Sequence, residues 1–288
     1  MRPLYMASMI DLHSHTTASD GQYPPADVVR RARDAGVTSL AITDHDTTNG
    51  LAEALEAAAA IGIELVPGIE ISSALGRRDI HLLGHFVRPD DPDLVAFCSR
   101  REGDRRRRMK EMVGRMNALG FPVSMERVES IAGDSKNLCR PHLARALVEM
   151  GYCRSPQEAF DRFIGDDGPA FAPTERLEAG DAIALIHSAG GAASLAHPGP
   201  DRFDRYQIGQ LRALGLDGLE VFHPDHDPGT RERYLGIARE LDLVPTAGSD
   251  FHGDRVAPDR QLGTASLSPA HFEALRTRAW RNRRGEPL

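Results

Sequence analysis

Short apolar runs alternate with longer amphipathic stretches along most of this 288-residue chain, and this rhythm restricts the possible folds more than any other feature. Several runs are apolar at consecutive positions, as in strands that are covered on both faces. We expect strands at residues 10–13, 39–43, 64–71, 80–86, 192–196, 218–222 and 244–248. The stretches between them predict helices at residues 25–35, 50–61, 179–189 and 231–240. Repeated strand-then-helix units favour an α/β fold with a parallel sheet or barrel.

One region interrupts this rhythm. Residues 92–173 carry helical signals and no convincing strand. The helices that we expect there are 94–119, 140–150 and 155–164. A chain of this length fits one large domain, or one domain with a smaller one inserted. We therefore expect a barrel formed by residues 9–91 and 174–288, with residues 92–173 as a helical insertion.

Residues that commonly bind metals occur at or just beyond the ends of the predicted strands. They are His13, His15, Asp20, His45, Glu70, His81, His197, Asp250 and His252. The carboxyl ends of parallel strands meet at one edge of a barrel, where active sites form, so these side chains should lie close together. His81 is the exception, because it stands near the start of its predicted strand.

The chemistry of these residues suits a site with several divalent cations. Imidazole binds zinc, manganese and iron, and a carboxylate can bridge two cations and offset their charge. In an extended strand, residues two apart such as His13 and His15 point to one face. A single histidine at a strand end is more often an ordinary loop residue, but several such motifs, each after an apolar run, favour a metal site. Asp11 and Asp44 are candidates to orient the ligand rings.

Five segments resemble the motifs of the PHP (polymerase and histidinol phosphatase) family and occur in that family's order. They read DLHSHTTASDG, ITDHDTTNG, PGIEIS, LAHPG and GSDFH. The resemblance extends from residue 9 to about residue 264. Within the family it is closest to the stand-alone metal-dependent phosphoesterases, which have a helical insertion and a segment like Arg-Pro-His-Leu-Ala at residues 140–144.

This resemblance implies a distorted seven-stranded (β/α)7 barrel whose helical insertion covers an active site with two or three divalent metals. Manganese is the expected metal, with zinc or iron as alternatives. The first metal would be held by His13, His15, Glu70 and Asp250. The second would share Glu70 and add His81 and His197. The third would be held by Asp20, His45 and His252, although many family members have a histidine at the position of Asp20.

The resemblance also implies an activity. Similar proteins remove the 3′-phosphate from nucleoside 3′,5′-bisphosphates or shorten small RNAs from the 5′ end. We therefore expect a metal-dependent phosphoesterase that acts on such bisphosphates, with short 5′-phosphorylated RNA as the alternative substrate. A histidinol-phosphate-type phosphatase is a further alternative, although the large insertion suits a bulkier substrate. A non-catalytic metal-binding module and an amide-cleaving hydrolase are disfavoured, because every ligand position holds a residue that can coordinate a metal and basic residues stand nearby.

We expect the insertion to supply substrate contacts. The guanidinium of Arg140 could bind a phosphate through two parallel hydrogen bonds. His142 follows it at the start of a predicted helix, where backbone N–H groups also favour anions. Lys136 and Asn137 precede them in the same loop and are candidate substrate contacts. The alternative is that Arg140 and His142 only cap the helix.

Histidines after a later strand complete the expected catalytic set. His223 and His226 follow residues 218–222 and should line the pocket, with His223 also in contact with the substrate. Arg140 would stabilise negative charge on the phosphoryl group. The proton for the leaving oxygen would come from His223 or His252, and the sequence does not decide between them.

The charge pattern narrows the range of partners. A net charge of −7 argues against a general nucleic-acid coat and leaves a small phosphorylated substrate, a nucleotide or a short RNA, as the expected partner. Residues 100–110 are a local exception, with seven basic and two acidic residues. Such a run usually forms a solvated helix face; the alternative is a surface that steers a polyanionic substrate.

The remaining features of the sequence concern the cellular compartment in which we expect the protein. Cys98, Cys139 and Cys153 are an odd number without paired spacing, which argues against a disulfide framework or a cysteine zinc site and predicts a reducing, cytoplasmic compartment. We find no signal peptide in the first ten residues and no stretch of about 18 apolar residues, so no membrane association is expected. Nothing in the sequence indicates an obligate protein partner.

Overall fold

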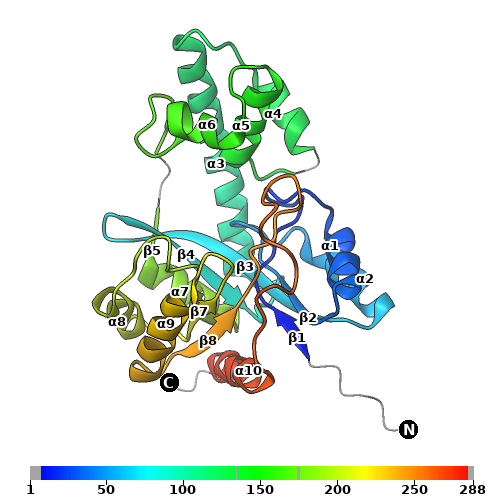
Figure 1. The fold of residues 1–288 in the computed structure, drawn as a ribbon, viewed down its shortest axis with the longest axis vertical. Helices are drawn as coiled ribbons and strands as arrows, with labels where there is room; N and C mark the ends of the chain where they lie inside the picture. The colour runs from blue at the N-terminus through cyan, green and yellow to red at the C-terminus, as the bar shows by residue number, and fades with distance from the viewer. Residues whose placement is uncertain (1–7, 134, 174–175, 285–288) are drawn as a thin grey trace.

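The computed structural model describes residues 8–133, 135–173 and 176–284, and within them eight strands form one sheet with helices around it (Figure 1). The strands are β1 Met9–Asp11, β2 Val37–Ile42, β3 Glu64–Leu75, β4 Arg78–His85, β5 Leu177–Glu178, β6 Ala192–Leu195, β7 Gly218–Phe222 and β8 Val244–Ala247. The seven expected strands are all present, and the two-residue β5 is an addition that the sequence did not predict.

The sheet is mostly parallel but contains one reversed strand. Its order is β1-β2-β3-β4-β6-β7-β8, and β5 pairs with β3. β4 runs antiparallel to both of its neighbours, β3 and β6, whereas the other pairs are parallel. The two ends of this order also meet, because Leu12 N donates to Ala247 O and Asp250 N donates to His13 O, each at 2.9 Å. The segments that follow β1 and β8 therefore lie side by side.

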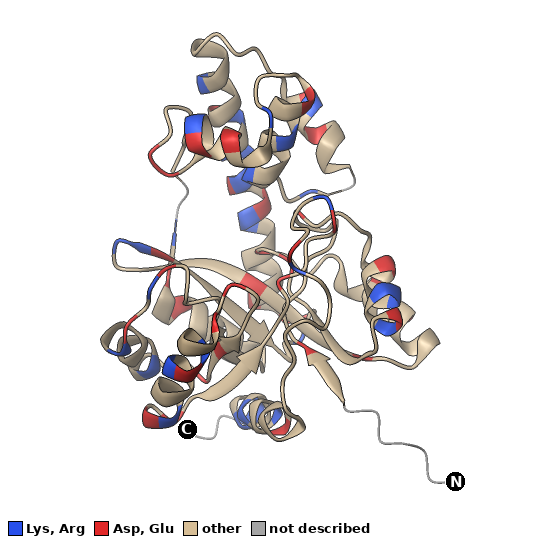
Figure 2. Ribbon diagram, viewed as in Figure 1, with Lys and Arg blue, Asp and Glu red and all other residues tan. Residues whose placement is uncertain are grey.

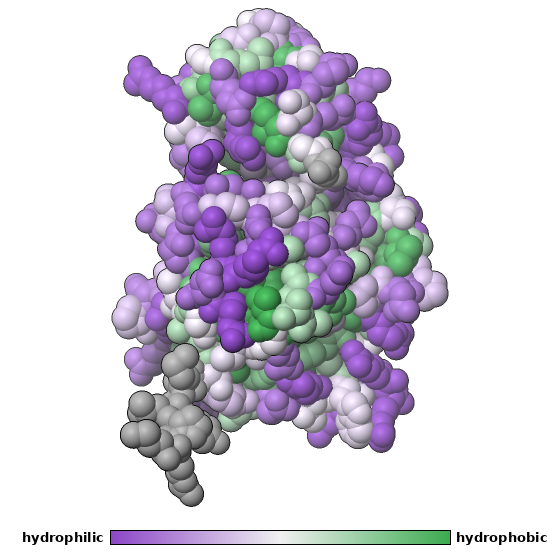
Figure 3. Space-filling model, turned by 90° about the vertical axis from the view of Figure 1, so that its right-hand side faces the viewer, coloured by the Kyte–Doolittle hydropathy of each residue, from purple (hydrophilic) through white to green (hydrophobic). Residues whose placement is uncertain are grey.

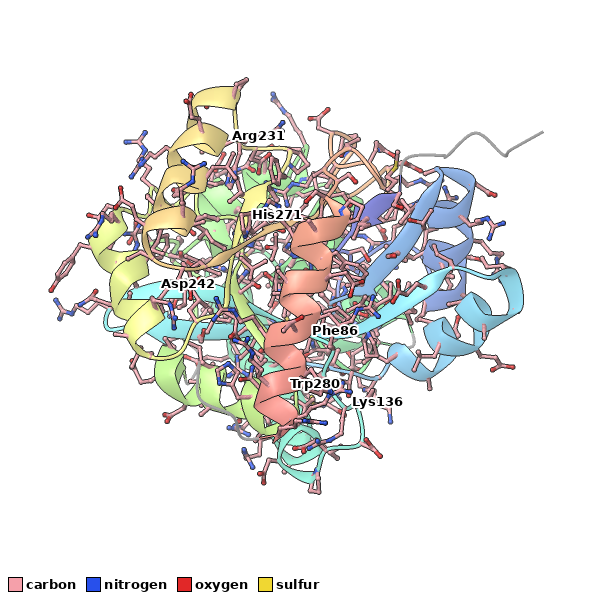
Figure 4. All side chains as sticks on the ribbon, turned by 90° about the horizontal axis from the view of Figure 1, so that it is seen from below. Phe86, Lys136, Arg231, Asp242, His271 and Trp280 are labelled. Carbon is pink, nitrogen blue, oxygen red and sulfur yellow. The ribbon has the colours of Figure 1, made fainter. Side chains whose placement is uncertain are left out.

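Helices cover the sheet on several sides. They are α1 Pro25–Asp34, α2 Leu51–Ile61, α7 Ala179–Ser188, α8 Arg205–Ala213, α9 Pro228–Glu240 and α10 Pro269–Arg284. The main apolar core lies between the central strands and α7, α8 and α9. Seen from below, α10 crosses the molecule with His271 toward one end and Trp280 toward the other (Figure 4). α10 packs through Phe272, whose ring centroid lies 5.7 Å from that of Phe86. The sequence did not predict α8 or α10.

The chain between β4 and β5 forms helices joined by loops, and its described part contains no strand. Its helices are α3 Pro92–Ala118, α4 Met125–Ala132, α5 Arg140–Glu149, α6 Pro156–Ala159 and the π-helical turn η1 Phe160–Ile164. With 27 residues, α3 is about 40 Å long, and it runs from the sheet up into the other four (Figure 1). These helices bury a separate apolar cluster that includes Met112, Leu143 and Leu147. The expected boundary at residue 174 lies outside the described residues.

The surface is mainly hydrophilic, as expected for a fold that buries its apolar residues. Hydrophilic residues cover most of the face shown in Figure 3, with smaller groups of apolar residues between them. Among the described helices, none combines the length and the apolar character that a membrane span requires.

Candidate active site

The nine expected metal ligands lie together at one edge of the sheet. Their ligand atoms form four overlapping groups, and within each group these atoms are no more than 4.8 Å apart. The groups are His13, His15 and Glu70; His13, His197 and Asp250; His45, Glu70 and His81; and His15, Asp20, His45 and His252. Because the groups share members, they form one continuous cluster of imidazole and carboxylate groups.

Glu70 occupies the centre of this cluster and is fully buried. Its Oε2 lies 3.1 Å from His15 Nε2 and 3.3 Å from His13 Nε2. Its Oε1 lies 2.9 Å from His81 Nδ1 and 3.2 Å from His197 Nε2. The two oxygens thus face different histidines, which is the arrangement a carboxylate needs to bridge two cations.

The direction of β4 explains the position of His81. Seven of the other candidate ligands follow the carboxyl end of a parallel strand, and Glu70 lies within β3. β4 is antiparallel, so its amino-terminal half lies at the same edge, and His81 pairs in register with Ser72 of β3. The expected strand at residues 80–86 is close to the observed β4. The expectation that this strand runs parallel to its neighbours was wrong.

Several buried atoms of the cluster have no hydrogen-bond partner among the described residues. They are His15 Nδ1, Asp20 Oδ1, His45 Nδ1 and His81 Nδ1. The nitrogens of His45 and His81 come close to Glu70 without the alignment that a hydrogen bond needs. An unsatisfied buried polar atom costs about 1–3 kcal/mol, so four of them in one place call for a further partner. Nitrogen and oxygen donors in this number fit divalent metal ions.

The electrostatics of the cluster also favour cations. Burial alone would raise the pKa of Glu70, but His45 and His81 beside it lower that pKa well below its usual range. Burial likewise opposes a charge on His15, yet hydrogen bonds with Asp250 and Glu70 raise its pKa to about 10. The carboxylates therefore stay ionised and attract positive charge, either as protons on the rings or as metal ions in their place.

A cavity of about 260 Å³ opens between the cluster and the helical region. Asp20, His45 and His81 contribute to one part of its wall. The rest includes five arginines, which are Arg101, Arg105, Arg108, Arg140 and Arg176. Phe160 and Phe171 add the aromatic side chains of this wall. A cavity with a metal-type cluster on one side and guanidinium groups on the other suits a phosphorylated ligand.

Comparison with known proteins agrees with this geometry. The model of the PHP domain family matches residues 11–106. A 5′-3′ exoribonuclease of Haemophilus influenzae is 36% identical over 251 residues, which cover 86% of this chain and 91% of that relative. A 3′,5′-nucleoside bisphosphate phosphatase of Chromobacterium violaceum is 34% identical over 248 residues, which cover 84% and 87% of the two chains.

This chain belongs to the PHP family. A solved structure from Bifidobacterium adolescentis, described as a metal-dependent phosphoesterase, has the same fold with a TM-score of 0.87 and 34% identity. The match covers 94% of this chain and 96% of that one. The nine-residue cluster and the arginine-rich cavity are thus features of a PHP protein of the phosphoesterase type.

Glu220 supports the cluster of this PHP protein, and the sequence analysis missed it. Its Oε1 lies 3.1 Å from His13 Nδ1, and its Oε2 accepts a hydrogen bond from the backbone N–H of His197 at 2.7 Å. Asp11 and Asp44, which we expected to orient ligand rings, instead accept hydrogen bonds from loops: Asp11 from the backbone of Ser249, and Asp44 from the Thr16 backbone. The position of Glu220 within a predicted strand gave no sign of its role.

Arg260 is a second residue that the sequence analysis missed. It lies in the loop after β8, donates to Asp250 Oδ2 through Nη1, and pairs with Asp225 through Nη2 at 2.7 Å. The other oxygen of Asp250, Oδ1, faces His13 and His15, each at 3.2 Å. Arg260 therefore leaves one carboxylate oxygen of Asp250 directed into the cluster.

The four residues of the insertion that we expected to contact the substrate do not all lie at the cavity. Arg140 lines the cavity, as expected. His142 is buried and does not line it; its Nδ1 accepts the backbone N–H of Cys139, so it caps α5. Asn137 is also buried and donates to the backbone oxygen of His45, and Lys136 is exposed outside the cavity lining. Of these four residues, Arg140 alone contributes to the cavity wall.

His223 and His226 lie near the cluster but do not line the cavity. His223 is fully buried, and its Nδ1 accepts the backbone N–H of Asp225 at 3.1 Å. Its Nε2 lies 3.5 Å from Asp250 Oδ2 and has no hydrogen-bond partner among the described residues. His226 Nδ1 donates to Val221 O and its Nε2 accepts from Gly199 N. The expectation that both line the pocket was wrong, because the chain turns inward after β7.

The basic run lies along α3 (Figure 2), and its side chains divide between two faces of the helix. Arg101, Arg105 and Arg108 follow a spacing of four and three residues, which places them on one face, toward the cavity. Arg106, Arg107 and Lys110 are exposed on the other side. The expectation of a wholly solvated face was therefore wrong for three of the seven basic residues.

Proposed function

We propose that this protein is a metal-dependent phosphoesterase that removes the 3′-phosphate from nucleoside 3′,5′-bisphosphates. The observation that carries the proposal is a cavity that the nine-residue cluster borders through Asp20, His45 and His81, with five arginines in the rest of its wall. The relative from Chromobacterium violaceum, named as a phosphatase for such bisphosphates, supports this choice. The cavity volume of about 260 Å³ lies just below the usual range of ligand pockets, so we propose a small substrate such as a single nucleotide.

The cluster would hold two or three divalent metals. We assign the first to His13, His15, Glu70 and Asp250, the second to Glu70, His81 and His197, and the third to Asp20, His45 and His252. Manganese is our first choice, with zinc or iron as alternatives. When bound, such metals lower the pKa of water from about 15.7 toward neutrality and offset charge on the phosphoryl oxygens.

The residues of the chain have distinct parts in this proposal. Arg140 binds an anionic group of the substrate from the side of the helical region. The proton for the leaving oxygen would come from His223, or from His252 where His252 is not bound to the third metal, and His252 is the more exposed of the two. We propose residues 92–173 as an inserted domain that covers the cavity and excludes water from it. Three free cysteines agree with the reducing cytoplasm that we expect for the protein.

A second candidate function is 5′-3′ exoribonuclease activity on short 5′-phosphorylated RNA. The observation in its favour is the relative from Haemophilus influenzae, which is named for this activity and is matched over 91% of its length. Both candidate substrates carry a 5′-phosphate and react near a 3′-oxygen, so the same cavity could serve either one. A histidinol-phosphate-type activity has no comparable observation in its support.

Parallel assays separate these candidates. Manganese-loaded protein is incubated with a nucleoside 3′,5′-bisphosphate, a 5′-phosphorylated oligoribonucleotide and histidinol phosphate, and release of phosphate or mononucleotide is measured. We expect the fastest reaction with the bisphosphate, its loss after chelation, and its loss in Glu70→Gln. Full activity in metal-free protein, or turnover of histidinol phosphate alone, would disprove the proposal.

A further inference from the structure

The arginines of the cavity wall differ in whether a carboxylate pairs with them. Arg101 and Arg105 both pair with the carboxylate of Asp46, with Nη2 of Arg101 at 3.1 Å and Nε of Arg105 at 3.0 Å. The other two partners lie nearer the surface: Arg140 pairs with Asp166 at 2.6 Å, and Arg176 pairs with Asp79 at 2.9 Å. Among the described residues, ion pairs with carboxylates therefore involve four of the five arginines of this wall.

Arg108 is the fifth of these arginines. Among the described residues, no carboxylate lies within ion-pair distance of it, and its Nε donates a hydrogen bond to the backbone oxygen of Ala172, at 2.7 Å. Burial, together with the like charges of Arg140 and Arg105, lowers the pKa of Arg108 to about 10. A guanidinium that is half-buried, next to other guanidinium groups and free of a carboxylate, gains most from an added anion.

The side chain of Arg140 is already held near Arg108. Its Cζ lies 5.6 Å from the ring centroid of Phe160 and 5.7 Å from that of Phe171. Arg108 Cζ lies 5.3 Å from the same Phe171 ring. Aromatic rings at these distances restrict the motion of a guanidinium and so reduce the entropy lost when it binds a ligand.

These two arginines belong to the helical side of the cavity, Arg108 in α3 and Arg140 in α5. Among the described residues, no ion pair or hydrogen bond joins Arg108 or Arg140 to the nine residues of the cluster. Bond cleavage belongs beside the cluster, where metals would act. The anion that Arg108 and Arg140 receive is therefore a different group of the same substrate.

We propose that Arg108, together with Arg140, binds the phosphate that is not cleaved, the 5′-phosphate of the nucleotide, and that Arg108 is the residue that selects substrates carrying it. This inference rests on the proposed function, because it takes the substrate to be a nucleotide. It applies equally to a bisphosphate and to a 5′-phosphorylated RNA. Asp166 holds Arg140 until the substrate phosphate replaces it.

Steady-state kinetics with two matched substrates test whether Arg108 selects for the 5′-phosphate. Wild type, Arg108→Gln and Arg108→Lys are compared on a nucleoside 3′,5′-bisphosphate and on the matching nucleoside 3′-monophosphate, which lacks the second phosphate. We expect Arg108→Gln to raise KM for the bisphosphate by about 10- to 100-fold with little change in kcat, and to leave the monophosphate unaffected. Arg108→Lys should recover part of the loss, because it keeps the charge without the planar fork. Equal effects on both substrates, or none, would overturn the proposal.

Lys110→Gln is the matched control. Lys110 lies on the exposed side of the same helix, so this change removes one positive charge without altering the cavity. It should leave both KM values at the wild-type level. A bisphosphate KM that rises as much in Lys110→Gln as in Arg108→Gln would show that general attraction, and not the Arg108 contact, sets the preference.

A binding measurement separates failure of this inference from failure of the proposed function. Calorimetry with a nucleoside 5′-monophosphate reports on the uncleaved phosphate alone and needs no turnover. We expect Arg108→Gln to weaken this binding by at least 10-fold, while Lys110→Gln does not. If wild type releases no 3′-phosphate but shows this binding difference, the proposed reaction is wrong and the phosphate site stands. Unchanged binding in a folded Arg108→Gln variant would refute the site whatever the reaction.

Discussion

The carboxylate of Glu220 lies between the ring of His13 and the backbone of His197, and it accepts a hydrogen bond from each. Such a contact fixes the tautomer and the orientation of a metal-binding imidazole. We therefore expect Glu220→Gln to weaken manganese binding by about 10- to 100-fold, as measured by titration calorimetry. Glu240→Gln removes an exposed carboxylate and serves as the control. Wild-type affinity in Glu220→Gln would refute this role.

Gly248 tests how closely the chain must pack behind the cluster. A Cβ placed there would lie 2.1 Å from His13 Cβ and 2.8 Å from His13 N, so alanine would push the β1 and β8 segments apart. We expect Gly248→Ala to lower the free energy of unfolding by about 1–3 kcal/mol in urea titrations. Gly114→Ala should instead raise it by about 0.5–1 kcal/mol, because that glycine lies in α3 with open space around it. Equal stability of the two variants would contradict this account.

At the level of residues, the sequence predicted which residues form the cluster better than it predicted where each side chain points. The nine ligand candidates were predictable, because polar residues of metal-binding types follow apolar runs. The roles of Asp11 and His142 were not, because both depend on which backbone N–H groups lie nearby in the folded chain. Glu220 was missed for a related reason: within a strand, the side to which a carboxylate points depends on the register of the strand with its neighbours.

At the level of elements, the main error concerned β4. We expected a parallel strand, yet β3 continues to Leu75 and β4 begins at Arg78, so only two residues connect them. Such a short connection is possible only between antiparallel strands, and Gly76 provides the positive φ of 63° that tight turns use. The Gly-Arg pair was therefore a usable signal. The short β5 carries no such signal, since two residues show no periodicity.

α3 is joined to the sheet by the buried carboxylate of Asp46, which contacts both Arg101 and Arg105. Removing one partner of a buried ion pair typically costs 3–5 kcal/mol, whereas exposed pairs contribute at most about 1 kcal/mol. We expect Asp46→Asn to lower the free energy of unfolding by roughly 3 kcal/mol, measured in urea. Asp104→Asn, at the exposed Arg107 pair, should change it by less than about 1 kcal/mol.

The pH dependence gives an independent check of the same contact. Burial opposes ionisation of Asp46, but Arg105 and Arg101 lower its pKa to about 2, from an ordinary value of 3.8. A carboxyl group whose pKa is lower in the folded state stabilises the protein above its unfolded pKa, and this contribution is lost as the pH falls from about 4 to about 2. The stability difference between wild type and Asp46→Asn should therefore shrink over this range. A difference that stays constant down to pH 2 would contradict the ion-pair explanation.

At the level of the whole molecule, the alternation of strands and helices was enough to predict the α/β class and the interrupting helical region. It was not enough to predict how the ends of the sheet meet. The hydrogen bonds from Leu12 to Ala247 and from Asp250 to His13 join residues more than 230 positions apart in the sequence. Their formation depends on the twist and packing of every strand between them, which no local pattern records.

Metal binding should stabilise the whole fold, because the cluster connects distant parts of the chain. His13 follows β1, Glu70 lies in β3, His197 follows β6 and Asp250 follows β8. A ligand that binds only the folded state stabilises it by about 4 kcal/mol at a concentration of 1,000 times its Kd. We expect manganese to raise Tm by several degrees over the value in EDTA, as measured by thermal unfolding. Glu70→Gln should lose most of this increase, because it removes the carboxylate that both halves of the cluster share. An equal increase in Glu70→Gln would place the stabilising metal elsewhere.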